Sequence, residues 1–209
     1  MSNQILKEQW VQWLDQLAEK EFVLIDNFLP LNILQSLEEL FEKVYQKDDF
    51  NPAKVGSSYH EKRIDEIRSD SIYWLDKTQH SSIALFFELI REMMQEISEF
   101  LFLSLQGYEF HFANYPQGGY YKAHLDQFKE RNNRMISVVI YLNKNWENGM
   151  GGELKIHGEN ELLIEPIYNR AVIFRSDTIL HEVLPTQFER KSLTGWLLKR
   201  PSDIGVLNY

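Results

Sequence analysis

The sequence predicts an α+β fold, with helices in about the first half of the chain and a β core in the second half. Two observations lead to this prediction. Before Gly107 apolar residues recur at spacings of three and four, whereas after it short alternating or apolar segments follow one another between turn residues. Many short strands at close spacing are typical of a sandwich or barrel. The apolar faces of the helices must be buried, so we expect them on the outer face of one sheet.

The first half is expected to contain three helices and one strand. Helical periodicity covers residues 5–18, 32–46 and 81–102. The apolar run "FVLIDNFL", residues 22–29, predicts a short buried strand. Residues 48–71 are polar and irregular, and they predict a long mobile loop of the kind that often carries function.

The second half is expected to be built from strands. The segments, in chain order, are "YEFHFANY", "YYKAHLDQF", "MISVVIYLN", "GELKIHG", "LLIEPI", "RAVIFRS", "HEVLPT" and "KSLTGWLLK". Turn residues such as "PQGG" and "ENGMGG" separate them. No Pro/Gly/Ser-rich linker divides the chain, so we expect residues 1–209 to form a single domain, with helical support in 1–105 and the β core in 106–200.

Composition excludes several classes of site. The chain has no cysteine, which excludes disulfides, thiolate metal sites and cysteine nucleophiles. Its formal net charge of −9 disfavours binding to nucleic acid, which depends on Lys and Arg. No apolar run reaches the ~18 residues of a membrane helix, and the N-terminus has no secretory pattern. We therefore expect a cytoplasmic protein that binds neither nucleic acid nor a membrane.

One short stretch indicates a metal site. In an extended strand, His124 and Asp126 point to the same side, because side chains alternate. His181, which follows a strand-like run, would complete a set of two imidazoles and one carboxylate, the set that suits non-haem Fe(II). Taken alone, this spacing is more typical of polar residues on the surface of a strand, so the three residues by themselves favour that interpretation and leave the metal site open.

A second stretch indicates an anion site. On a strand through "RKSLTGW", Arg190, Ser192, Thr194 and Trp196 share one face. A guanidinium with two hydroxyls can hold a carboxylate by charge-assisted hydrogen bonds. The alternative for Arg190 is an ordinary salt bridge at the surface.

Together these motifs resemble a known family. The segments "YPQGGYYKAHLD", "IYLN", "GGELKI", "PIYNRAVIFRSD", "HEV" and "RKSLTGW" resemble the 2-oxoglutarate and Fe(II)-dependent dioxygenases of the prolyl 4-hydroxylase type. "IYLNKNW", "EIRSDSIYWLD" and the position of Arg190 resemble more closely the hypoxia-factor prolyl hydroxylases and their bacterial relatives. The resemblance covers about residues 66–198. It implies a double-stranded β-helix, or jelly roll, as the β core.

The resemblance also implies roles for the residues that match. His124, Asp126 and His181 would be the iron ligands, and Arg190 would bind the distal carboxylate of 2-oxoglutarate. Lys191 is a rival anchor, because collagen-type members use lysine, but strand alternation favours Arg190.

Other residues would line the same pocket. Tyr141 and Tyr115 resemble tyrosines of the cosubstrate site, and the alternative for both is core packing with the hydroxyl bonded locally. Thr194 and Trp196 share the face of Arg190. The resemblance favours Arg68 and Asp70 as substrate contacts; the alternative is that they pair with each other.

The resemblance implies the activity. A single catalytic domain would hydroxylate a prolyl residue of a protein substrate, with O2 and 2-oxoglutarate as cosubstrates, succinate as coproduct and ascorbate as a candidate reductant. A translation elongation GTPase is a candidate substrate, because it is a target of bacterial relatives. The alternatives are hydroxylation of another residue or of a small molecule, or a non-catalytic jelly-roll binding module.

Overall fold

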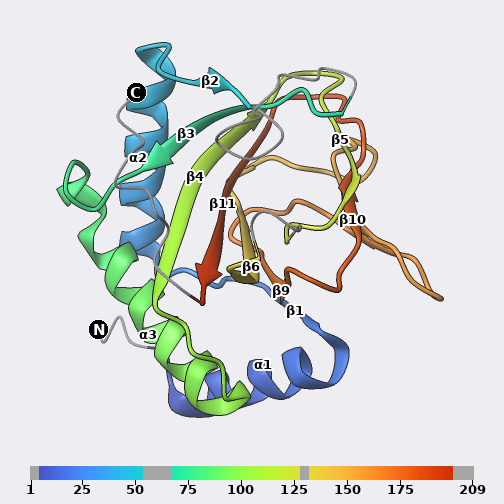
Figure 1. The fold of residues 1–209 in the computed structure, drawn as a ribbon. Helices are drawn as coiled ribbons and strands as arrows, with labels where there is room; N and C mark the ends of the chain where they lie inside the picture. The colour runs from blue at the N-terminus through green and yellow to red at the C-terminus, as the bar shows by residue number, and fades with distance from the viewer. Residues whose placement is uncertain (1–4, 54–66, 128–131, 200–209) are drawn as a thin grey trace.

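The computed structural model describes residues 5–53, 67–127 and 132–199, and these form two facing antiparallel sheets with helices along one side (Figure 1). The helices are α1 (Lys7–Lys20), α2 (Leu31–Gln46) and α3 (Ala84–Leu101), the last preceded by the short 3-10 helix η1 (Ser81–Ile83). They match the three predicted helices to within a few residues.

The larger sheet has seven strands. In spatial order they are β1 (Phe22–Ile25), β9 (Ala171–Arg175), β6 (Arg134–Tyr141), β11 (Arg190–Leu198), β4 (Gly107–Tyr115), β3 (Ser71–Leu75) and β2 (Asn51–Pro52). The smaller sheet has the order β5 (Tyr121–His124), β10 (His181–Val183), β7 (Leu154–Ile156) and β8 (Leu162–Ile164). This pair of sheets confirms the predicted jelly-roll core.

Strand alternation divides the larger sheet into two faces. Phe110 and Phe112 of β4 belong to the apolar cluster that includes the buried faces of all three helices. Ala113 and Tyr115 point the other way and pack with residues of the smaller sheet. The helices therefore cover the outer face of one sheet, as expected from their apolar stripes. In Figure 1, α2 and α3 stand on one side of β3, β4 and β11, and β5 and β10 on the other.

The structure departs from the expected elements in two places. The predicted strand around residues 120–128 ends at His124, so Asp126 lies in a bend beyond β5. The expected loop 48–71 contributes Asn51–Pro52 to β2 and Ser71 to β3, which pair with each other; residues 54–66 lie outside the described part. None of the helices in the described part of the chain is both long and apolar enough to cross a membrane.

Candidate active site

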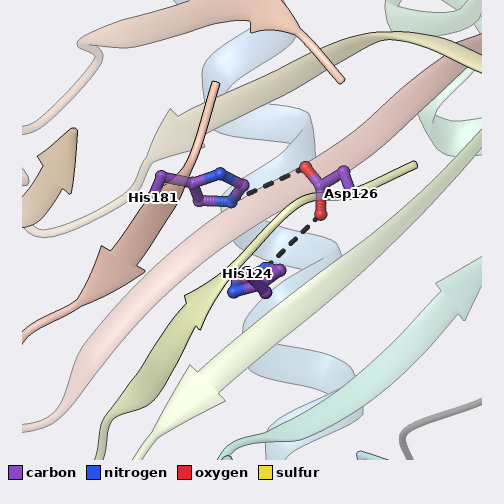
Figure 2. A group of neighbouring side chains, drawn as sticks. All are labelled: His124, Asp126 and His181. Atoms are coloured by element: carbon purple, nitrogen blue, oxygen red, sulfur yellow. Dashed lines mark ion pairs between the residues drawn. The ribbon is translucent and has the colours of Figure 1, made fainter. Parts of the chain in front are cut away.

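Three side chains that are distant in sequence meet between the sheets (Figure 2). His124 ends β5 and His181 begins β10, and the two residues are direct partners in the antiparallel ladder. Asp126 follows β5, and one ligand atom from each residue lies within 4.8 Å of the others. Nε2 of His124 lies 3.5 Å from Oδ1 of Asp126, and Nε2 of His181 lies 3.7 Å from Oδ2. Such spacings suit atoms that share one metal at about 2 Å each.

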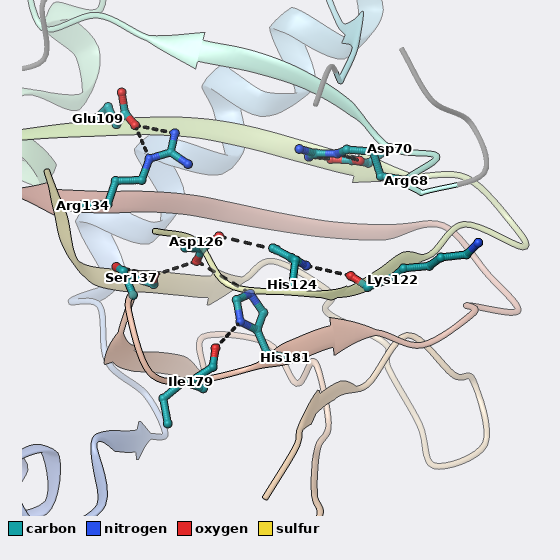
Figure 3. Close-up of polar contacts among 11 residues, drawn as sticks. Arg68, Asp70, Glu109, Lys122, His124, Asp126, Arg134, Ser137, Ile179 and His181 are labelled. Atoms are coloured by element: carbon teal, nitrogen blue, oxygen red, sulfur yellow. Dashed lines mark hydrogen bonds and ion pairs between the residues drawn. The ribbon is translucent and has the colours of Figure 1, made fainter. Parts of the chain in front are cut away.

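Backbone carbonyls orient both imidazoles toward this centre (Figure 3). Nδ1 of His124 lies 2.8 Å from the carbonyl oxygen of Lys122, and Nδ1 of His181 lies 3.0 Å from that of Ile179. A carbonyl only accepts hydrogen bonds, so the hydrogen of each neutral ring sits on Nδ1. The lone pair of each Nε2 is therefore free to bind a metal.

The charges of the three residues also suit a metal. Burial opposes ionisation of Asp126, but nearby His181, His124 and Arg134 outweigh it and hold the pKa of the carboxyl well below its usual range. Burial lowers the pKa of His181 to about 4, although the Asp126 carboxylate opposes this shift. At neutral pH the site thus presents an ionised carboxylate and a neutral buried imidazole, the forms that bind metal ions.

Arg190 is buried at the start of β11, only 2% exposed. Its Nε donates to the carbonyl oxygen of Gly152 at 2.8 Å, and Nη1 donates to Oγ of Ser192 at 3.4 Å. The rings of Tyr115 and Tyr141 lie 4.9 and 5.1 Å from the guanidinium carbon. No carboxylate among the described residues lies within ion-pair distance of Arg190, which leaves a buried cation without a counter-ion.

Lys191 points to the opposite face of the sheet. Its Nζ lies 3.0 Å from Oε2 of Glu189 and 5.2 Å from each of the rings of Phe41 and Tyr45. The alternation expected from the sequence is confirmed, and it removes Lys191 from the interior where Arg190 lies.

A hydroxyl beside Arg190 remains unsatisfied. The hydroxyl of Tyr141 is buried near the guanidinium but makes no hydrogen bond of ordinary geometry with a described residue. Nε1 of Trp196 is also unbonded, but this residue lies six positions further along β11, and its ring contacts Arg134 and His111 instead. Burial raises the pKa of Tyr141 and of Tyr115, with the charge of Arg190 opposing both shifts, so both hydroxyls stay protonated. Thr194 makes one long contact, 3.4 Å, with Oγ of Ser192. An unbonded buried hydroxyl next to a buried cation is a place where an anionic ligand fits.

Arg68 and Asp70 contact each other at the edge of this interior. Nε of Arg68 donates to Oδ1 of Asp70 at 2.7 Å, in a two-point pair. The Arg68 guanidinium also lies 4.3 Å from the ring centre of Tyr121, and that ring stacks on His124 at 3.7 Å. Pairing was one of the two alternatives for these residues, and the sequence did not indicate their link to His124 through Tyr121.

A second buried ion pair was missed by sequence reasoning. Nε of Arg134 donates to Oε1 of Glu109 at 2.8 Å, and its guanidinium lies 3.4 Å from the ring centre of Trp196. His111 stacks on Trp196 and also contacts the ring of Trp74. Glu109, His111 and Tyr115 lie on the same face of β4. Polar residues repeated on one face of a predicted strand were the signal that could have revealed this buried pair.

The residues present fit an iron ion with 2-oxoglutarate. Two imidazoles and one carboxylate form the three-ligand set of non-haem Fe(II) sites, which leaves positions open for other ligands. Arg190 lacks an anion, and the Tyr141 hydroxyl beside it lacks an acceptor. A dicarboxylate that reaches from the metal to Arg190 would satisfy both.

Comparison with known proteins agrees with this geometry. A model of the 2OG-Fe(II) oxygenase superfamily matches residues 110–198, the segment that contains the trio and Arg190. The crystal structure of a Pseudomonas putida prolyl-4-hydroxylase has a TM-score of 0.82 with this chain and is 33% identical to it; the match covers 91% of this chain and 99% of that one.

Two animal proteins are also similar. A prolyl hydroxylase from Trichoplax adhaerens, solved with a peptide fragment of the hypoxia inducible factor oxygen degradation domain, has a TM-score of 0.82 and is 25% identical; the match covers 92% of this chain and 90% of that one. The hypoxia-inducible factor prolyl hydroxylase of Caenorhabditis elegans is 28% identical over 198 residues, which are 88% of this chain. The match covers 27% of that relative, about a quarter of its length.

Proposed function

Since the chain belongs to the 2-oxoglutarate and Fe(II)-dependent oxygenases of the prolyl hydroxylase type, we propose that it hydroxylates a prolyl residue of a protein substrate while 2-oxoglutarate is decarboxylated to succinate. The observation that carries the proposal is the juxtaposition of His124, Asp126 and His181 with the buried, unpaired guanidinium of Arg190. A binding module would have no need of that combination.

Each residue has a distinct task in this proposal. His124, Asp126 and His181 hold the iron, which supplies the oxidative chemistry when bound together with 2-oxoglutarate and O2. Arg190 binds the distal carboxylate, and the Tyr141 hydroxyl donates a second hydrogen bond to it. The carbonyl of Gly152 fixes the guanidinium in place. Burial of Arg190 and Tyr141 keeps water away, so their hydrogen bonds act in a medium of low dielectric.

The proposed substrate is inferred from the proteins to which this chain is similar. The Trichoplax protein was solved with a peptide, so we propose a protein segment with a target proline as the substrate. A translation elongation GTPase is the first candidate to test, because the sequence resembles bacterial members that act on one. Arg68 and Asp70 are proposed to line the entrance to the site, and ascorbate is proposed as the reductant that keeps the iron ferrous. Hydroxylation of another residue is the competing proposal on the same scaffold.

Two measurements test the function. First, Fe(II) and 2-oxoglutarate are titrated into the protein without oxygen, and both should bind. Second, the loaded protein is incubated in air with proline-containing peptides from candidate substrates, and mass spectrometry should find a gain of about 16 Da on proline, one inserted oxygen atom. A gain on another residue would favour the competing proposal, and no succinate release with any candidate would contradict an oxygenase.

A variant of one ligand provides the control. His181→Ala removes one of three donors to the iron, so succinate formation should fall to the background of metal-free protein. Undiminished succinate formation by this variant would refute the assignment of the iron ligands.

A further inference from the structure

Asp126 is not held by its own strand. β5 ends at His124, and Asp126 lies in a bend two positions later, yet it is only 6% exposed. Its carboxylate is held from the opposite sheet, because Oγ of Ser137 in β6 donates to Oδ2 at 2.6 Å (Figure 3). In this orientation Oδ1 lies 3.5 Å from Nε2 of His124, and Oδ2 lies 3.7 Å from Nε2 of His181.

A second serine fixes the first. Oγ of Ser176 lies 2.8 Å from Oγ of Ser137, and both residues are fully buried. An ionised carboxylate only accepts hydrogen bonds, so the single hydroxyl hydrogen of Ser137 points to Asp126. Ser176 must then be the donor to Ser137. The hydrogen bonds therefore run in one direction, from Ser176 to Ser137 to Asp126.

The residue after Asp126 is hydrogen-bonded to the same sheet as the carboxylate. The amide of Gln127 donates to the carbonyl of Ser176 at 2.9 Å, and Nε2 of Gln127 donates to the carbonyl of Arg134 at 2.6 Å. Ser137 and Ser176 lie close together because β6 pairs with β9, which ends one residue before Ser176. Hydrogen bonds from the larger sheet thus hold Asp126 and Gln127, the residues that follow β5 of the smaller sheet.

We propose that Ser137, supported by Ser176, is a positioning residue for the metal: it fixes the rotation of the Asp126 carboxylate relative to the imidazoles of His124 and His181. A carboxylate that rotates freely presents either oxygen, or both, to a metal ion. A hydrogen bond to one oxygen selects one arrangement and lowers the entropy lost on binding. The inference deepens the proposed function and depends on it only for the presence of a metal at the trio.

The experiment measures metal affinity without turnover. Fe(II) is titrated anaerobically into the full chain and into three variants, with unfolding temperatures recorded for each. Loss of a hydrogen bond to a metal ligand typically costs about 10- to 100-fold in affinity, so Ser137→Ala should raise the Kd by that factor. Ser137→Thr keeps a hydroxyl and should bind within about threefold of the wild type. Thr186→Val removes a buried hydroxyl that donates to the carbonyl oxygen of Phe188 and should leave the metal Kd unchanged.

The absorption spectrum of bound Co(II) distinguishes a change in metal coordination from a general loss of protein stability. Co(II) bound in place of iron absorbs visible light with an intensity and position that depend on its coordination. Ser137→Ala should change this spectrum, and Ser137→Thr should restore it. If Ser137→Ala does not fold, Ser176→Ala takes its place, because it removes only the donor to Ser137, and its Kd should rise by at least about threefold.

The outcomes are distinguishable from those of the proposed function. An unchanged Kd and an unchanged Co(II) spectrum in folded Ser137→Ala would overturn the positioning role and leave the oxygenase proposal intact. If the wild-type protein binds Fe(II) but hydroxylates no proline, the proposed hydroxylation is overturned and the positioning role of Ser137 is still tested by the metal Kd. Wild-type protein that binds no Fe(II) would overturn both.

Discussion

At the scale of single residues, Arg190 and Lys191 are adjacent cations with opposite fates. The pleat of β11 turns Arg190 into the interior and Lys191 toward α2, where Glu189 neutralises it. Arg190 has two tyrosine rings and a carbonyl around it but no carboxylate within the described residues. A buried, uncompensated guanidinium is costly to the fold, so its presence is best explained by an anion that binds there.

The pair supplies a matched test. Arg190→Ala should raise the Kd for 2-oxoglutarate roughly 10- to 100-fold, since hydrogen bonds between charged groups contribute about 1.5–3 kcal/mol. Lys191→Ala removes the same charge from the other face and should leave this Kd unchanged. Calorimetry with Mn(II), which does not turn over, measures both. If Lys191→Ala raised the Kd more than Arg190→Ala, Lys191 and not Arg190 would be the residue that binds the carboxylate.

At the scale of elements, the turn before β7 positions the guanidinium of Arg190. Gly152 has a φ of +76°, its carbonyl accepts the hydrogen bond from Arg190, and a Cβ there would lie 2.9 Å from Cδ of Arg190 and 3.1 Å from Cβ of Thr186. Gly149, in the same turn region, has a φ of +92° but has no atom within 4 Å of the position of a Cβ. Both glycines relieve backbone strain, and only Gly152 also makes room for Arg190.

Alanine at the two positions separates these effects. Gly152→Ala should displace the guanidinium and raise the Kd for 2-oxoglutarate at least about tenfold, because its hydrogen bond to the carboxylate is lost or bent. Gly149→Ala should cost only the left-handed backbone strain, about 1–2 kcal/mol of unfolding free energy, with the Kd unchanged. Calorimetry and urea unfolding of both variants test this expectation. Equal Kd values for the two variants would show that Gly152 does not shape the site.

At the scale of the whole molecule, the interior between the sheets holds neutral imidazoles. Burial lowers the pKa of His181 to about 4, and burial with the charges of Arg68 and Arg134 places the pKa of His111 well below its usual value. In the unfolded chain both rings titrate near pH 6.5. As pH falls through 6.5, the unfolded chain takes up protons that the fold excludes, so stability falls with pH.

The metal-free protein should therefore lose stability in mild acid. Each buried imidazole should cost on the order of 2 kcal/mol of unfolding free energy between pH 6.5 and 5, at about 1.4 kcal/mol per pH unit. Urea unfolding at pH 7, 6 and 5 measures the slope. His111→Phe keeps an aromatic ring in contact with Trp74 and Trp196 without a titrating group, so its slope should be smaller. A wild-type stability that is constant from pH 7 to 5 would contradict the neutral, buried state of both rings.

Much of the fold and part of the site could be predicted from local patterns. The three helices follow from apolar spacings of three and four, and the β core from short alternating segments. The alternation along β11 separated Arg190 from Lys191 without a structure, because the side-chain period of a strand depends only on its own backbone. The same periodicity placed His124 and Asp126 near each other, although Asp126 proved to lie beyond the strand.

The sequence by itself determined which residues have the chemistry for a metal and an anion, and that Arg190 and Lys191 occupy opposite faces of their strand. Only the tertiary structure decided that His181 pairs with His124 across β10 and β5 and that Ser137 holds the carboxylate of Asp126. The physical reason is range: the period of a helix or strand is set by neighbouring residues, whereas these contacts join strands that pair only when the two sheets close over a common interior.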